Sequence, residues 1–523
     1  MKNLKIYFIV LAVVVIGMGG CTEKFDEINT DPLALTADKV NASLIGLAFA
    51  QTQYNTVNGV HWRFQISQNL FSDLYCQYFA TTQSNFDSDR YTQVGRWSDL
   101  CWSSFYGEAA PNIKFVEDFT AENGFDVQNA VAKVWRVYGY HRITDYYGPV
   151  PYSEFGNGET SVAYDSQEEM YRSFFTTLNE AIDVLKANAN GNAFGSNDQI
   201  YSGDVGLWIK FANTLKLRLA MRVKYVDAAL AKKNAEEAVA GGVIEDNSEN
   251  ATMLTTSNSP NPINTITNWG EYRMSAAMES VLKGFDDPRM PTYFSPAVDG
   301  DSDGDGIPYE GLRNGQSKID LTNNKNNNHS DLGTNFLPPN INNNPRIVVI
   351  RAGEAYLLRA EGALEGWNMG GSAQALYEEG ISQSIMEWTA ADAATINAYI
   401  NSSNTPVPTG DVHGTPALSD IPVKYEGGAS KERQLEQIIT QKWLALYPDG
   451  WEAWAELRRT GYPKQYDRLN SDNPDIGVGD IMRRMVYVTS EFNNNPDAVE
   501  AAIASPEMGG ADKGSTKLWW DKK

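Results

Sequence analysis

The segment 346–388 constrains the fold more than any other stretch, because it reads as two helices joined by a short break. Its first half repeats small residues, which let a neighbouring helix approach closely; these are Ala352, Ala355, Ala360, Gly362 and Ala363. Gly366, Gly370 and Gly371 interrupt the pattern before apolar residues return. Such a helix pair cannot bury its apolar face alone and needs another pair stacked on it. The sequence therefore predicts further helix pairs elsewhere in the chain.

Apolar residues at helical spacing indicate more such pairs, with irregular segments between them. In the clearest example, Trp208, Phe211 and Leu215 follow the i, i+3, i+7 spacing of an amphipathic helix. Helix pairs are expected in three regions, which are 127–240, 352–388 and 433–459. Two excursions rich in loop-forming residues separate them, at 246–350 and 399–430. Since long irregular segments in compact proteins are often functional, we expect a mainly α-helical frame that supports a binding face.

The N-terminus has the pattern of an export signal. Lys2 and Lys5 precede a short apolar run over 6–16, which is too short for a membrane-spanning helix and is typical of a secretory signal. Small residues directly before Cys21 resemble a bacterial lipobox, in which that cysteine becomes the lipidated first residue; a plain signal with an incidental cysteine is the alternative. We divide the chain into a signal peptide (1–20), a lipidated tether (21–37) and a body (38–523).

The other two cysteines leave two alternatives open. Cys76 and Cys101 fall in two neighbouring predicted helices, 62–80 and 97–106. In an exported protein they could form a disulfide, because such compartments are oxidising. Two buried free thiols are the other interpretation. The sequence shows no catalytic environment around either residue.

Charge and motifs bear on the class of protein. The formal net charge is -23, which repels the phosphate backbone and makes nucleic acid an unfavourable partner. The chain contains no His-Glu-x-x-His zinc motif, no Gly-Lys dipeptide of a P-loop and no Gly-x-Ser-x-Gly elbow. We therefore expect a binding protein and not an enzyme. A surface glycoside hydrolase is the alternative, because the 66 acidic residues include many possible carboxylate pairs.

An Asp-rich loop is the sharpest local signal for a metal. Asp301, Asp303, Asp305 and Gly306 match positions 1, 3, 5 and 6 of a calcium-binding loop, where alternating carboxylates converge on a hard cation. Position 12 is Leu312, whereas an EF-hand has a bidentate Glu there. The sequence thus suggests a Ca²⁺ ion held by the three aspartates, with a solvated acidic turn as the alternative.

Aromatic residues in polar segments suggest a sugar-binding site, since sugar rings stack their C–H faces on Trp and Tyr while polar side chains bond the hydroxyls. The candidate glycan-binding residues are Tyr91, Arg96, Trp97, Asn268, Trp269 and Tyr272. The alternative is that these residues cap the helical core. The Trp residues inside predicted helices are instead expected in the core by their apolar periodicity; they are Trp135, Trp208, Trp443 and Trp454.

Several segments together resemble the SusD/RagB family of outer-membrane nutrient-binding lipoproteins. The resemblance is carried, in chain order, by CTEKFDEINTDP, HRITDYYGPVPYSE, LWIKFANTLKLRLAMRV, FDDPRMPTYFSP, QKWLALYPDGWEAWAELRRTGYP and STKLWWD. These segments span nearly the whole chain after the signal peptide. The helix pair at 352–388 also fits the family pattern.

The resemblance implies a fold with about four tetratricopeptide-like helix pairs and a loop-rich ligand-binding face. It implies a lipid-anchored protein of the outer membrane, exposed at the cell surface, that binds oligosaccharides without cleaving them. It also implies a partner, a TonB-dependent outer-membrane transporter of the SusC type that receives the nutrient. A protein of the same fold that captures peptides is a further alternative. No family motif assigns ligand residues, so the candidate site rests on the aromatic residues alone.

Overall fold

The computed structural model describes residues 42–333 and 346–523. The predicted signal peptide, Cys21 and the tether over 21–37 therefore lie outside the described residues. The chain divides into two units, 1–45 and 46–523, and the description below concerns the second. Across the described ranges, no helix combines the length and the apolar character needed to cross a membrane.

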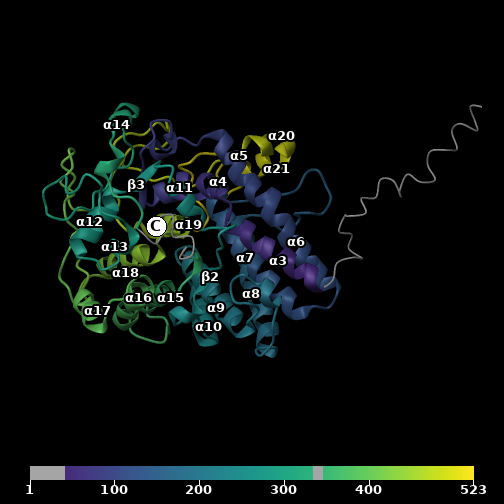
Figure 1. The fold of residues 1–523 in the computed structure, drawn as a ribbon. Helices are drawn as coiled ribbons and strands as arrows, with labels where there is room; N and C mark the ends of the chain where they lie inside the picture. The colour runs from purple at the N-terminus through teal and green to yellow at the C-terminus, as the bar shows by residue number, and fades with distance from the viewer. Residues whose placement is uncertain (1–41, 334–345) are drawn as a thin grey trace, which may run out of the picture. The chain divides into compact units, whose positions relative to one another are not determined.

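Helix pairs form the frame, which confirms the mainly α-helical fold class. The helices are α7 (Asp126–Tyr147), α8 (Gln167–Ala187), α9 (Val205–Arg222), α10 (Ala228–Gly241), α15 (Ala352–Leu364), α16 (Ala373–Trp388), α18 (Lys431–Leu446) and α19 (Gly450–Thr460). Successive helices contact one another from α7 to α10, and α15 contacts α9, α16 and α18. In Figure 1, α9 and α10 lie side by side, as do α15 and α16. Stacking of neighbouring pairs thus buries the apolar faces, as the segment 346–388 requires.

Local signals fix where these helices begin and end. At the start of α8, the hydroxyl of Ser166 accepts from the backbone N–H of Glu169, whose carboxylate accepts in return from the N–H of Ser166. Helix α9 begins after Asp204, whose carboxylate accepts from the N–H of Leu207. Helix α7 ends before Gly148, which has a φ of 84° that a residue with a side chain rarely adopts.

The N-terminal part of the body differs from its predicted helices. The predicted helix over 62–80 is instead a short helix, a π-helical segment and a strand; these are α4 (His61–Phe64), η2 (Gln65–Asp73) and β1 (Phe79–Thr81). Strand β1 pairs antiparallel with β3 (Tyr272–Met274), with Phe79 opposite Met274. Because its partner lies far away in the sequence, local periodicity gave no sign of this strand. The predicted helix at 97–106 covers α5 (Gly95–Ser103) and the start of η4 (Ser104–Ala109).

The remaining described elements lie outside the helix pairs, and most of them are short. Beside α3 (Ala42–Thr56) and α6 (Ala110–Glu122), these are η3 (Asp87–Arg90), η5 (Gly195–Asn197), η6 (Asn247–Glu249), β2 (Ala251–Met253), α11 (Pro262–Thr267), α12 (Ala276–Phe285), α13 (Met290–Tyr293), α14 (Lys318–Asn323), η7 (Asn326–Asn328), β4 (Ile347–Ile350), α17 (Ala393–Ile400), α20 (Thr489–Asn494) and α21 (Pro496–Ala504). Strand β2 pairs antiparallel with β4. The pair β1–β3 joins the excursion 246–350 to residues 79–81, whereas the pair β2–β4 joins the two ends of that excursion to each other.

The core contains both aromatic residues and charges. Trp135, Trp208, Trp443 and Trp454 are fully buried, as their periodicity predicted, and Trp520 joins them. A buried ionic network, defined here as the charged side chains that join α7, α9, α15, α18 and α19, runs between the helices. Its members are Asp145, Arg222, Lys224, Glu361, Lys442, Glu452, Glu456 and Arg459. The network ties helices from both halves of the chain together.

Cys76 and Cys101 are free, buried thiols, so the structure favours the second of the two alternatives. Burial raises the pKa of Cys101 to about 11 and that of Cys76 well above its usual value. Because the thiolate is the reactive form, we expect neither to react with Ellman's reagent in native protein that lacks residues 1–21. Both should react in concentrated guanidinium chloride. A reactive thiol in the native protein would contradict their burial.

Candidate functional site

Three of the predicted glycan-binding residues are buried, which corrects their assignment as exposed stacking surfaces. Tyr91 is 2% exposed, Trp97 7% and Tyr272 2%. The hydroxyl of Tyr91 donates to the carbonyl oxygen of Asp480 over 2.7 Å, and the ring of Trp97 meets Phe86 edge-on. With so little of each ring exposed, none of the three offers an open face to a sugar. The residues cap the core, which was the alternative interpretation of the sequence.

Trp269, Asn268 and Arg96 are exposed, and Trp269 belongs to an aromatic surface. The rings of Trp269 and His61 meet at 5.6 Å with an interplanar angle of 74°. Trp62, beside His61 on α4, is 40% exposed, as is Trp269. We call Trp62, Trp269 and His61 the aromatic platform. Helices α4 and α11 contact each other (Figure 1), and the first residue of α4, His61, thereby meets Trp269, which follows α11 by two residues.

Trp62 and His61 were missed by the sequence analysis. The segment 62–80 was expected to be one helix, in which Trp62 would be one more aromatic residue among many. The structure shows that α4 ends at Phe64 and that Trp62 reaches solvent. The guanidinium of Arg63 lies 5.1 Å from the centre of the Trp62 ring and also pairs with Glu108. Gly59 and Val60 interrupt the helical pattern before α4, and this interruption was the sequence feature that could have indicated a separate short helix there.

The backbone beneath the platform is held by two other parts of the chain. The carbonyl oxygen of Gly270 accepts from the Thr82 hydroxyl and from the Asn326 amide, each over 2.7 Å. Gly270 itself has a φ of 64°, so the turn after Trp269 favours glycine. The Trp269 ring therefore projects from a turn that is already ordered. Such preorganisation lowers the entropic cost of binding.

Polar groups lie beside the platform. The Gln65 amide donates to the Glu271 carboxylate over 2.5 Å, and burial raises the pKa of Glu271. The exposed amide of Asn268 lies next to Trp269 in sequence and donates weakly, over 3.4 Å, to the carbonyl oxygen of Asn264. Exposed rings with amides and a carboxylate at their edge are the side chains that a sugar requires. The platform can stack on a sugar ring and bond its hydroxyls.

A polar cavity of about 470 Å³ lies on the same excursion. This volume is within the range of pockets that hold small ligands. Its lining includes Glu310, Arg313, Asn324, Asn328, His329 and Thr409. The segment 324–329 joins the cavity to the platform, because its Asn326 bonds Gly270 while its neighbours line the cavity. Burial lowers the pKa of His329 to about 4, so this imidazole is neutral at neutral pH.

The Asp-rich loop reaches this cavity. Asp301, Asp303 and Asp305 each offer a carboxylate oxygen within 4.8 Å of the others. The ammonium group of Lys283 lies 3.3 Å from the Asp303 carboxylate and 3.0 Å from that of Asp305. The Asp301 carboxylate accepts from the backbone N–H groups of Gly304 and Gly306. The three aspartates thus converge as a cation site requires, but Lys283 already contacts two of them.

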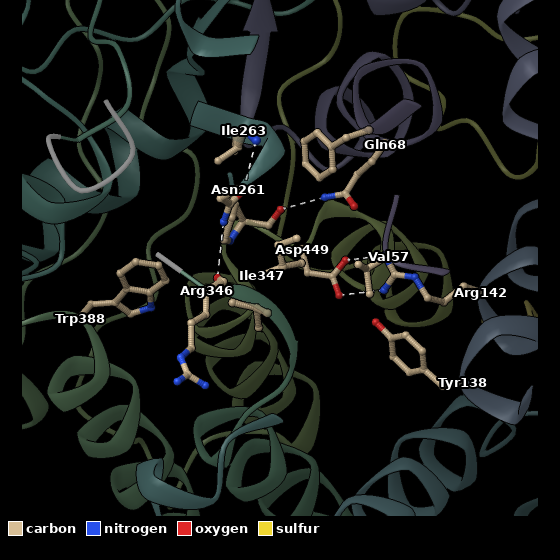
Figure 2. A pocket seen from close by; sticks show the side chains of 13 residues that line it. Val57, Gln68, Tyr138, Arg142, Asn261, Ile263, Arg346, Ile347, Trp388 and Asp449 are labelled. Carbon is tan, nitrogen blue, oxygen red and sulfur yellow. Dashed lines mark hydrogen bonds and ion pairs between the residues drawn. The ribbon is translucent and has the colours of Figure 1, made fainter. Parts of the chain in front are cut away.

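A second cavity is lined by residues of η2, α7, α11, β4 and α16 and is too small for a sugar. Its volume is about 40 Å³, which is room for a few water molecules. Figure 2 shows the Arg142–Asp449 ion pair at its side and Gln68 donating to the carbonyl oxygen of Pro448. Asn261 donates to the carbonyl oxygen of Arg346 across the cavity. We interpret this cavity as part of the packed interior.

Comparison with known proteins identifies relatives over nearly the whole chain. The sequence matches the family described as Susd and RagB outer membrane lipoprotein over residues 27–521. A chitin-binding SusD homolog from Flavobacterium johnsoniae is 34% identical, with a TM-score of 0.83 over 91% of this chain and 98% of its own. A SusD homolog from Bacteroides thetaiotaomicron is 32% identical, with a TM-score of 0.81 over 92% and 99%.

A third structure, a SusD homolog from Bacteroides vulgatus, agrees with these two. It is 32% identical, with a TM-score of 0.82 over 91% of this chain and 97% of its own. A comparison with curated proteins gives no match. The similarity in sequence and in three dimensions therefore extends from the helix pairs to the excursions that carry the platform and the cavity.

Proposed function

The chain belongs to the SusD-like family of outer membrane lipoproteins, and from this premise we propose that it binds oligosaccharides at the cell surface without cleaving them. The observation that carries the proposal is the aromatic platform. Trp62 on α4 and Trp269 both expose their rings, and the turn that bears Trp269 is fixed by hydrogen bonds from Thr82 and Asn326 to the carbonyl oxygen of Gly270. The chitin-binding relative supports a ligand built from sugar units.

Isothermal titration against a panel of oligosaccharides tests this proposal. The panel contains oligomers of N-acetylglucosamine, glucose and xylose, with unstructured peptides of similar length as a second class. We expect binding to at least one oligosaccharide and none to the peptides. Binding only to peptides would overturn the proposal in favour of peptide capture. New reducing ends after incubation would instead indicate a glycoside hydrolase.

We further propose that the protein delivers its ligand to a SusC-like, TonB-dependent transporter while anchored through Cys21. The family membership and the predicted lipobox support this. Affinity purification of the tagged protein from detergent-solubilised outer membranes should recover such a transporter. The Cys21→Ala variant should leave the membrane fraction. Recovery of the wild-type protein alone would count against the partnership, and an unchanged location of the variant would count against the anchor.

Calcium binding at Asp301, Asp303 and Asp305 stays a prediction. The convergence of the three carboxylates supports it, whereas the contacts of Lys283 oppose it. If the ion binds, adding CaCl2 to chelator-treated protein should raise its melting temperature, because a ligand that binds only the folded state stabilises it. Asp301→Asn should remove that rise. An unchanged melting temperature in the wild-type protein would exclude a stabilising calcium site.

A further inference from the structure

The polar cavity holds more negative than positive charge. The ammonium group of Lys283 is the common partner of four carboxylates: Glu279 at 3.1 Å, Asp303 at 3.3 Å, Asp305 at 3.0 Å and Glu310 at 3.5 Å. One ammonium can neutralise one of them. The four carboxylates therefore exceed the single ammonium group that contacts them.

The remaining charged groups of the cavity do not restore the balance. Asp320 and Asp411 add two carboxylates to the lining. Arg313 also lines the cavity and adds one positive charge, which is fewer than the two carboxylates; its guanidinium donates to the Thr415 hydroxyl over 2.6 Å and to the carbonyl oxygen of Asp467 over 2.7 Å. The two imidazoles are His329, which is neutral, and His413, whose neighbour Asp411 binds the His413 backbone N–H. The cavity therefore favours a cationic ligand.

A buried hydroxyl gives an independent sign of a ligand. Thr409 lines the cavity and is 2% exposed. Among the residues that the structure describes, nothing forms a hydrogen bond with its hydroxyl oxygen. Leaving a buried polar group unpaired costs about 1–3 kcal/mol, so such groups normally have a partner. A donor supplied by a ligand would satisfy it.

The cavity is fixed relative to the aromatic platform. Ala80 of β1, Leu312 and Leu321 of α14 pack in one small buried cluster, and Leu312 also lines the cavity. The segment 324–329 contributes to the cavity and, through Asn326, supports the turn that bears Trp269. A ligand made of repeated units can therefore contact both places when it lies across this segment.

We propose that the cavity binds the ammonium group of an amino sugar, so that the substrate class is an oligosaccharide with free 2-amino-2-deoxyhexose units. This inference rests on the proposed function and names its ligand more closely. The ammonium group has three donors, which match the carboxylate of Glu310, the carboxylate of Asp411 and the hydroxyl of Thr409. Neighbouring sugar units stack on Trp269 and Trp62. Acidic glycans, such as uronates, are repelled by the same carboxylates.

Three tetramers that differ in one substituent test the proposal by isothermal titration in the presence of a chelator. They are the oligomers of glucosamine, N-acetylglucosamine and β-linked glucose, at a slightly acidic pH where the free amine is charged. We expect the glucosamine oligomer to bind at least about 10-fold more tightly than the other two, which corresponds to about 1.4 kcal/mol. Its affinity alone should fall as NaCl is raised, because salt screens charges.

Two variants on different sides of the cavity keep the test independent of folding. Glu310→Gln and Asp411→Asn should each weaken binding of the glucosamine oligomer several-fold and leave the N-acetylglucosamine oligomer unaffected. Thr409→Val should act in the same direction. Circular dichroism melts identify any variant that is misfolded, and the inference then rests on the others.

Each outcome separates this inference from the proposed function. Equal affinity of the wild-type protein for the three tetramers would overturn the amino-sugar inference and leave glycan binding in place. Displacement of the glucosamine oligomer by CaCl2 would also overturn it, because the excess charge would then serve a metal ion. Failure to bind any oligosaccharide in the wider panel would overturn the proposed function itself.

Discussion

Replacing Trp269 with alanine is expected to weaken oligosaccharide binding by about 30-fold, which corresponds to the loss of about 2 kcal/mol at a central aromatic contact. The ring is 40% exposed and projects from a turn that Thr82 and Asn326 hold in place. Its removal takes away the stacking surface while the turn remains. Isothermal titration with the tightest oligosaccharide of the panel measures the change.

Phe115→Ala is the matched control for Trp269→Ala. Phe115 lies on α6, is also 40% exposed and lies outside the platform and the cavity. We expect its removal to leave the affinity within about twofold, which is a change of about 0.4 kcal/mol. Equal affinity of the wild-type protein and the Trp269→Ala variant would remove the platform from the binding site. In that case, titration of the Trp62→Ala variant would show whether the Trp62 ring contributes to binding without Trp269.

Replacing Arg459 with alanine is expected to destabilise the fold by roughly 3–5 kcal/mol, because it leaves buried carboxylates without a partner. The Arg459 guanidinium binds both carboxylate oxygens of Glu361 at 2.6 Å and also contacts Glu456. Burial alone would lower the pKa of Arg459, but the carboxylates of Glu361 and Glu456 raise it well above its usual value. Urea unfolding followed by circular dichroism measures the loss.

Arg172→Ala is the control for Arg459→Ala. Arg172 pairs with Glu168 one turn away on α8, and both side chains are about half exposed. An exposed pair of this kind contributes below about 1 kcal/mol, since solvent screens it. The two arginine variants should therefore differ by several kcal/mol. Similar unfolding midpoints for both would mean that the buried ionic network is not what stabilises the frame.

The sequence predicted the frame well because its signal is local. In α9, for instance, the residues that repeat at helical spacing are the residues that the neighbouring helices bury. The strand β1 had no such signal, because Phe79 owes its extended backbone to Met274 on β3. Helical spacing of aromatic residues across 62–80 therefore predicted one helix where three elements occur. Long-range pairing overrode the local pattern.

The site was only partly predictable for the same reason. Tyr91, Trp97 and Trp269 all occur among polar residues, and nothing near them in sequence separates a buried ring from an exposed one. Tyr91 is covered because its hydroxyl meets the Asp480 backbone, 389 residues away. Trp269 remains exposed because it projects from the turn that ends at Gly270. The cavity combines residues from 279 to 413, so no single motif could indicate it.

The contacts of Trp520 with the buried ionic network bear on the order of events during synthesis. Its indole N–H donates to Asp145, 375 residues earlier, and its ring lies against the guanidinium groups of Arg222 and Arg458. Burial of Asp145 and Arg222 is unfavourable until their partners later in the chain have been synthesised. We expect a fragment that ends at residue 440 to be open to proteolysis, and a resistant fragment would refute this. A nascent chain would therefore remain loosely folded until the segment that contains Trp520 has been synthesised.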